Sequence, residues 1–176
     1  PKMDQVNVIG GDIQAFMQAK LLKHKSKWIK PPVYLNTVES DIEVERAARN
    51  EGFETKQCAV GDKWILWESF LSQWKCRKQY FLDRVDDSEF QALTIEVDTK
   101  LEQMQESATF DAVKATNSVF LVEKWLIEKK RSELVNLAHA HACEISNNFF
   151  AIGSEESGHI ITLGQIRSGK LIRPVY

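Results

Sequence analysis

A short polar segment that begins at Gly153 directly follows an apolar run and combines several groups that can bind or react. It contains a carboxylate (Glu155), a hydroxyl (Ser157), a flexible glycine (Gly158) and an imidazole (His159). If the backbone is extended here, Glu155, Ser157 and His159 share one face, because side chains alternate along a strand. These groups can hold polyol hydroxyls and move a proton, so they suit a sugar. A solvated turn is the alternative interpretation.

This segment resembles the sugar-binding loop of the α-D-phosphohexomutases, whose usual form is Gly-Gly-Glu-x-Ser-Gly-His. A second run, 60–65, reads Val-Gly-Asp-Lys-Trp-Ile and resembles the Gly-x-Lys/Arg-aromatic-Ile/Val element in the third domain of that family. Four more segments resemble parts of the same domain in the same order, namely the leading helix (11–17), the first strand (32–37), the first helix (42–48) and the second strand (54–59).

The resemblance implies the third domain of a four-domain enzyme that interconverts hexose 1-phosphate and hexose 6-phosphate. It implies an α/β fold in which helices flank a small mixed sheet. The implied substrate-binding residues are Gly61, Asp62, Lys63, Glu155, Ser157 and Gly158. His159 is the implied general acid and base. The implied partners are a hexose phosphate and the remaining domains of the parent protein.

The sequence also departs from the family pattern. Ser154 replaces a glycine of the loop, and Val38 stands where some members carry a lysine that contacts the sugar. The chain has no Ser-His-Asn loop, no Asp-Gly-Asp metal loop and no Arg-x-Ser-Gly-Thr phosphate loop. Phosphoryl transfer needs a nucleophile and a cation. We therefore expect the isolated chain to be inactive, with Mg²⁺ and a hexose bisphosphate activator belonging to the full-length enzyme.

A protein of another class is the alternative prediction. The parent protein would then be a non-catalytic sugar-phosphate binding or interaction module derived from the same family. The first residue is Pro1 rather than a methionine, which favours a piece of a longer protein. Catalytic loops upstream in the parent reading frame would favour the enzyme, and their absence would favour the module.

Composition narrows the class of protein further. A chain of 176 residues with 43% hydrophobic residues suits one globular domain. The net charge of −2 gives no reason to expect a nucleic-acid partner, and the basic residues of 20–30 fit a solvated helix end. The three cysteines are widely spaced and odd in number, which favours a reducing compartment, so we expect a cytoplasmic protein. No apolar run is long enough to span a membrane.

The hydrophobic pattern predicts three segments. We expect a leading helix and linker at 1–30, an α/β core at 31–75 and 146–176, and a large helical insertion at 76–145. The leading helix, at about 11–24, is indicated by apolar residues at helical spacing, namely Ile13, Phe16, Met17 and Leu21. In the helix after Gly61, an aromatic stripe predicts core packing, and its members are Trp64, Trp67, Leu71 and Trp74. The expected strands lie near 33–37, 53–59, 148–153 and 159–163.

The remaining polar clusters make weaker candidates. His139, His141 and Cys143 point to different sides of a predicted helix, so we expect no metal site there. Lys63 suits either a phosphate or an acidic partner in the turn. Arg167 and Lys170 suit a phosphate less well than a solvated turn. The sequence thus predicts a sugar-binding site without a resident metal ion.

Overall fold

The computed structural model describes residues 9–25, 28, 30–107, 111–145, 149–162, 166–167 and 170–171. Its centre is a mixed sheet of four strands in the order β2-β1-β3-β4. The strands are β1 (Val33–Thr37), β2 (Glu54–Cys58), β3 (Phe150–Ser154) and β4 (Ile160–Thr162). β1 runs parallel to β2 and β3, whereas β4 runs antiparallel to β3. The predicted α/β class with a small mixed sheet is confirmed.

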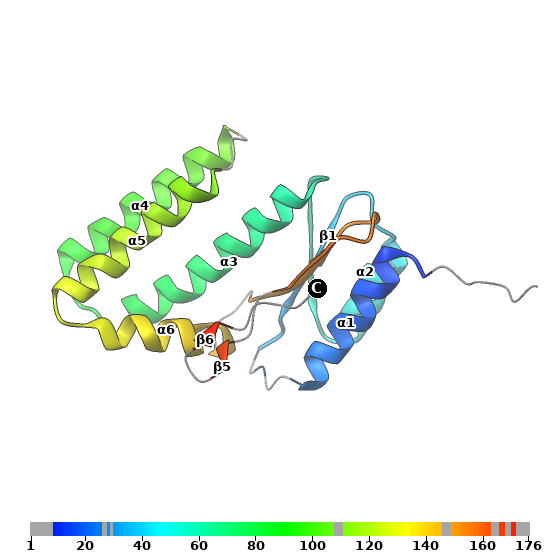
Figure 1. Cartoon of the computed structure of the whole chain (residues 1–176), viewed down its shortest axis with the longest axis horizontal. Coiled ribbons are helices and arrows are strands. Elements are labelled where there is room, and N and C mark those ends of the chain that lie inside the picture. Colours follow the sequence, from blue (N-terminus) through cyan, green and yellow to red (C-terminus); the bar gives the residue numbers. More distant parts are fainter. Residues whose placement is uncertain are drawn as a thin grey trace, which may run out of the picture.

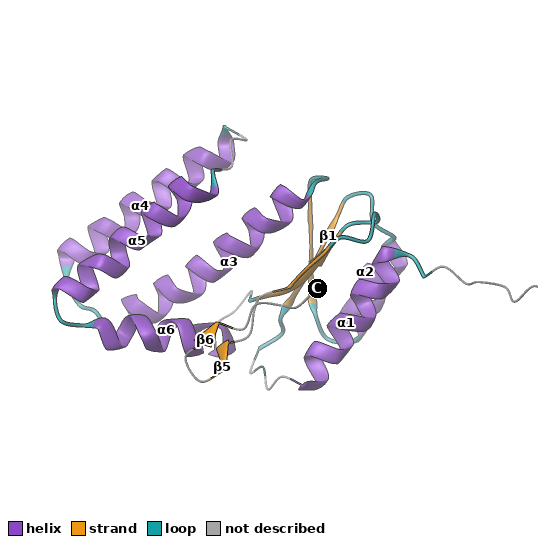
Figure 2. Ribbon diagram, viewed as in Figure 1, coloured by secondary structure: helices purple, strands orange, loops and turns teal. Residues whose placement is uncertain are grey.

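Helices cover both faces of this sheet. On one face lie α1 (Gly11–Lys25) and α2 (Ile42–Asn50), and on the other lies α3 (Asp62–Leu82) (Figure 1). Three further helices follow α3 in the described part of the chain, namely α4 (Ser88–Glu106), α5 (Ala112–Glu128) and α6 (Ser132–Ile145). The last two strands, β5 (Ile166–Arg167) and β6 (Lys170–Leu171), pair with each other. Figure 2 shows that α4 and α5 lie on the far side of α3 from the sheet.

Several elements begin or end where local chemistry requires. Asp41 caps α2 by accepting from the backbone N–H of Glu43 at 2.8 Å, which satisfies an otherwise unpaired donor. Asp87 caps α4 and Asp111 caps α5 in the same way. Gly52 follows α2 with a φ of 85°, which favours glycine. These short-range signals fix the helix boundaries.

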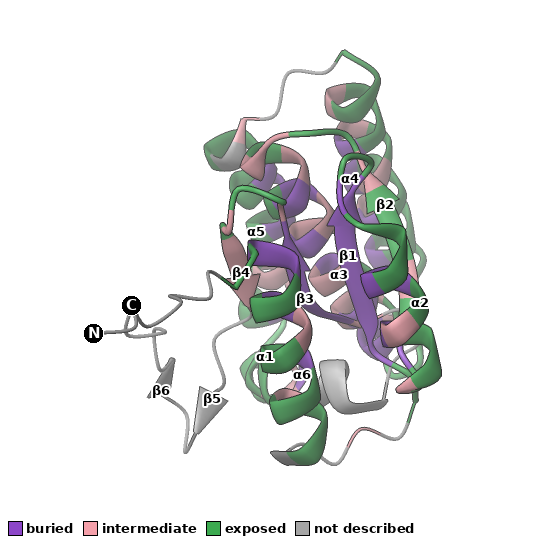
Figure 3. Cartoon of the chain, turned by 90° about the vertical axis from the view of Figure 1, so that its right-hand side faces the viewer, coloured by how far each residue is buried: buried purple, intermediate pink, exposed green. Residues whose placement is uncertain are grey.

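The α1 helix packs on the sheet through its small residues. Ala15 and Ala19 are fully buried, whereas Ile13, Met17 and Leu21 are exposed by half or more. The helix predicted from the spacing of the larger apolar residues is present, but these three side chains are not on its buried face. The alanines allow α1 to approach β3 closely, and that approach turns the larger residues outward (Figure 3).

The helices form a hydrophobic core of their own. Trp67 and Trp74 are 1% exposed and pack with side chains of α4, α5 and α6, which confirms core packing for the aromatic stripe of α3. The buried Trp74 indole N–H donates to Asp98 at 2.8 Å. α3 runs without a break through residues 75 and 76, so the predicted boundary there falls inside a helix. No helix in the described ranges is both long and apolar enough to cross a membrane.

Candidate functional site

The segment after β3 folds into a tight turn. The Gly158 N–H donates to the Glu155 carbonyl at 3.0 Å, and the Glu155 N–H donates to the His159 carbonyl at 3.1 Å. Gly158 has a φ of 94°, a conformation that disfavours other residues. The backbone is thus a turn between two strands and not the extended segment that would place Glu155, Ser157 and His159 on one face, because the chain must reverse within these residues to pair β4 with β3.

The turn still gathers the predicted side chains. The Ser157 hydroxyl donates to Glu155 Oε2 at 3.1 Å, and His159 Nδ1 lies 3.5 Å from the same oxygen. The Glu155 side chain is only 13% exposed, whereas that of His159 is 65% exposed. The largely buried Glu155 carboxylate thus contacts both the Ser157 hydroxyl and the more exposed His159 imidazole.

A second element joins this cluster from the start of α3. Gly61, with a φ of 116°, turns the chain out of β2 so that Asp62 opens the helix. Asp62 Oδ2 lies 3.2 Å from His159 Nδ1. The two segments meet because β2 and β3 both run parallel to β1, so their carboxyl ends lie at the same edge of the sheet.

The cluster leaves two carboxylate oxygens without hydrogen bonds. Asp62 Oδ1 and Glu155 Oε1 are shielded from solvent and have no partner among the described residues. Buried carboxylate oxygens normally accept hydrogen bonds or bind a cation, because an unpaired one loses its hydration without compensation. These two oxygens therefore lack a compensating interaction in the described part of the chain.

Lys63 lies beside the site rather than in the cluster. Its Nζ stands 4.9 Å from the centre of the Trp64 ring, and the residue is exposed. The ammonium group is therefore positioned by a cation–π contact at the start of α3. The resemblance implies that Gly61 binds substrate. In the structure, Gly61 contributes its backbone conformation, which turns the chain into α3.

The N-terminus of α1 packs closely against the turn, a contact that was not predicted from the sequence. A Cβ atom on Gly11 would lie 2.3 Å from Gly158 Cα and 2.9 Å from the Glu156 carbonyl oxygen. The next residue, Asp12, is buried and accepts from the Asp41 N–H at 2.9 Å, which ties α1 to α2. A glycine pair before an acidic residue is the only sequence signal of this contact.

Burial shapes the chemistry of two groups near the site. Burial raises the pKa of the Cys58 thiol to about 11, and the charges of Glu68 and Glu155 add to that rise. Burial likewise raises the pKa of Tyr34 to about 12, although a hydrogen bond to Ser154 opposes the shift. Both groups are therefore neutral at pH 7.

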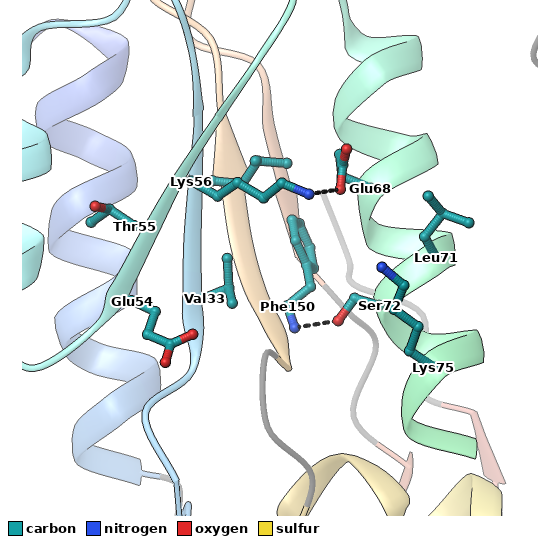
Figure 4. Close-up of a pocket in the computed structure, with 10 residues that line it drawn as sticks. Val33, Glu54, Thr55, Lys56, Glu68, Leu71, Ser72, Lys75 and Phe150 are labelled. Atoms are coloured by element: carbon teal, nitrogen blue, oxygen red, sulfur yellow. Dashed lines mark hydrogen bonds and ion pairs between the residues drawn. The ribbon is translucent and has the colours of Figure 1, made fainter. Parts of the chain in front are cut away.

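A separate cavity of about 330 Å³ opens between the sheet and α3. It includes Val33, Glu54 and Phe150, which begin β1, β2 and β3, so it lies toward the opposite end of the strands from the turn. Figure 4 shows Lys56 paired with Glu68 across it, and the Phe150 N–H donating to the Ser72 hydroxyl at 2.8 Å. The residues implied by the family resemblance do not line this cavity.

The other predicted candidates divide into two groups. His139 lies on the exposed side of α6, 3.0 Å from Glu123 and 3.2 Å from Arg77. The side chains of the other four candidates fall outside those the structure describes, namely His141, Cys143, Arg167 and Lys170. Burial alone would raise the pKa of Glu123, but the contacts with His139 and Arg77 outweigh burial and lower it.

Comparisons of the chain with protein-family models, with curated proteins and with solved structures found no significant match. The case for a function therefore depends on the motifs and on the geometry described above.

Proposed function

We propose that the chain is the sugar-binding domain of a phosphohexomutase that interconverts hexose 1-phosphate and hexose 6-phosphate. One observation carries the proposal. Two segments far apart in the sequence, each resembling a sugar-site element of that family, meet through the 3.2 Å contact between Asp62 and His159. Their meeting was expected from the motif order but required the parallel arrangement of β1, β2 and β3.

The side chains of the site would supply the hydrogen-bond acceptors and donors that bind the sugar. Glu155 accepts from Ser157 through Oε2, and its Oε1 has no hydrogen bond among the described residues, so a turn of the side chain toward the surface would let Oε1 accept from a sugar hydroxyl. The Ser157 oxygen can accept a hydrogen bond while its O–H donates to Glu155, and the exposed Lys63 offers a donor. A carboxylate held in place by its neighbours binds a hydroxyl without losing side-chain freedom, which favours a defined sugar orientation.

His159 is placed to move a proton. Its Nδ1 faces Asp62 and Glu155, whereas the ring as a whole is mostly exposed. Contacts with the two carboxylates orient the imidazole, and the exposed ring can approach a hydroxyl of a bound sugar. His159 would thus act as general acid and base at the reacting oxygen.

Phosphoryl transfer itself would be supplied by other domains of the parent protein. The family resemblance implies Mg²⁺ on an Asp-Gly-Asp loop, and this chain has no such sequence. Neither the metal nor the phosphorylated serine of the family would be held here. The residues of this chain would bind the sugar, orient it and move a proton.

Isothermal titration with hexose phosphates in the presence of EDTA tests the proposal. We expect glucose 1-phosphate or a related hexose phosphate to bind, and Glu155→Gln to weaken binding by about 10-fold or more, because one charged hydrogen-bond acceptor is lost. Glu68→Gln is the matched control, since Glu68 is a half-buried acid in the separate cavity. Equal effects of the two variants, or no binding of any hexose phosphate, would refute the proposed site.

A second candidate is a non-catalytic interaction module, and the outer face of α5 favours it. Val113, Phe120 and Ile127 recur every seven residues and are 69%, 52% and 48% exposed. This spacing places all three on one side of the helix, as in helix-pairing surfaces. Sedimentation of the chain and of Phe120→Lys would test it, because self-association should be lost in the variant.

A further inference from the structure

The cluster of Asp62, Glu155 and His159 has the composition of a transition-metal site. One carboxylate oxygen from each acid and one imidazole nitrogen all lie within 4.8 Å of one another. They come from two separate segments of the fold, the start of α3 and the turn after β3. Imidazole and carboxylate are ligands that Zn²⁺ and related divalent ions accept.

The spacing of these atoms fits a single ion. Ligand atoms bound tetrahedrally to Zn²⁺ at about 2.0–2.2 Å stand roughly 3.3–3.6 Å apart. His159 Nδ1 lies 3.2 Å from Asp62 Oδ2 and 3.5 Å from Glu155 Oε2. These two separations match a shared ion, and the two carboxylate oxygens, which lie within 4.8 Å of each other, would complete the set by a side-chain adjustment, with water in the remaining positions.

The charge around Glu155 also points to a cation. Three glutamates with little side-chain exposure are each paired with a lysine or arginine, as seen in Glu45 with Arg49, Glu68 with Lys56, and Glu123 with Arg77, whereas the buried Asp12 accepts from a backbone N–H. Glu155 is as buried as these acids, yet its charged neighbours in the described structure are another acid, Asp62, and His159, which is cationic only when protonated.

The unpartnered oxygens supply an independent observation. Asp62 Oδ1 and Glu155 Oε1 are both shielded from solvent without a hydrogen bond in the described part of the chain. A dication next to both carboxylates would compensate the lost hydration of these oxygens and the repulsion between the two acids. Neither a neutral imidazole nor the Ser157 hydroxyl can compensate both the lost hydration and the repulsion between the two acids.

We propose that Asp62, Glu155 and His159 bind a divalent transition-metal ion of the Zn²⁺ class. This site is separate from the Mg²⁺ that the family resemblance implies for another domain. Imidazole is a poor ligand for Mg²⁺, so Mg²⁺ should not compete. The inference goes beyond the proposed sugar function and does not depend on it, because the metal is measured in the absence of sugar.

The test titrates the metal-stripped chain with Zn²⁺ by calorimetry and with Co²⁺ by visible d–d absorption. We expect a 1:1 complex with a dissociation constant below about 0.1 mM. His159→Gln and Asp62→Asn should each weaken it by about 100-fold or more, because each removes a direct ligand. His139→Gln should change it by less than about threefold, since that exposed histidine has one acidic neighbour, which is already paired with Arg77.

Circular dichroism would show whether each variant is folded. Long-range ¹H–¹⁵N spectra of the unmodified chain give a second readout, in which Zn²⁺ should shift the ring nitrogens of His159 but not those of His139. Three results would each overturn the proposal. They are a Zn²⁺ dissociation constant above about 0.1 mM, Zn²⁺ binding that persists in His159→Gln, and Zn²⁺-induced ring-nitrogen shifts confined to other histidines. Sugar titrations in EDTA remain informative in every case, so failure of this site and failure of the sugar site are distinguishable.

Discussion

The contact between α1 and the turn gives the sharpest stability prediction, in the variant Gly11→Ala. Alanine is the better helix former by up to about 1 kcal/mol, so helix propensity alone predicts a more stable protein. The structure predicts the reverse. The new Cβ would lie 2.3 Å from Gly158 Cα and 2.4 Å from Gly158 N, whereas ordinary contacts lie at 3.4–4 Å. Either α1 or the turn must therefore move by about 1 Å.

Overpacking of this kind typically costs about 1–3 kcal/mol, so after a helix gain of about 1 kcal/mol we expect a net loss of up to about 2 kcal/mol. Urea unfolding followed by tryptophan fluorescence measures that loss, and amide chemical shifts of residues 155–159 report the displaced turn. Gly10→Ala is the matched control, because no atom lies within 4 Å of its added Cβ. A Gly11→Ala protein as stable as the wild type, with unchanged shifts in the turn, would refute the close packing.

Three further predictions concern ionisable groups. The free energy of unfolding should fall as pH rises from 10 towards 12, because the pKa of Tyr34 is about 10 in the unfolded chain and about 12 in the folded chain. Urea titrations of Tyr34→Phe should show a weaker dependence on pH in this range. Cys58 should react with iodoacetamide about 100-fold more slowly at pH 8 in the folded chain than in urea, as followed by peptide mass spectrometry, because its pKa rises from 9.0 to about 11. Arg77→Met should destabilise the chain by about 1–3 kcal/mol in urea, since it leaves the buried Glu123 with one partner, whereas the exposed Arg46→Met should cost less than about 0.5 kcal/mol.

Glu123 also sets a dependence at acidic pH. Its pKa is lower in the folded state than the ordinary value of 4.5, so its contribution to stability is present above pH 4.5 and is lost as pH falls below it. Arg77→Met should reduce the slope of stability against pH in this acidic range, and an unchanged slope would exclude Arg77 as a cause of the shift.

Local signals made much of the fold predictable. The cap at Asp41, the stop at Gly52 and the turn at Gly61 depend on backbone conformations and hydrogen bonds within a few residues. The strands were placed within a few residues because each is short and bounded by such signals. The meeting of Asp62 with the Glu155–His159 turn was predicted from motif order, since parallel strands place their carboxyl ends together.

Features set by tertiary packing were not predictable from the same patterns. The outward orientation of Ile13, Met17 and Leu21 depends on how closely α1 lies against β3, which helical periodicity does not encode. The role of Gly11 depends on a backbone contact with Gly158, far along the chain. The sequence placed a loop between the strands at 148–153 and 159–163, but the alternation of Glu155, Ser157 and His159 could not show how their side chains are arranged, which depends on the reversal that pairs β4 with β3.

The most direct test of the central claim is to locate the binding of a hexose phosphate on the ¹⁵N-labelled chain by NMR in EDTA. The account predicts that glucose 1-phosphate or a related hexose phosphate shifts amide signals of residues 61–63 and 155–159 together, and that Glu155→Gln abolishes both sets of changes. Shifts confined to the cavity around Lys56 and Ser72, or shifts that persist unchanged in Glu155→Gln, would contradict it.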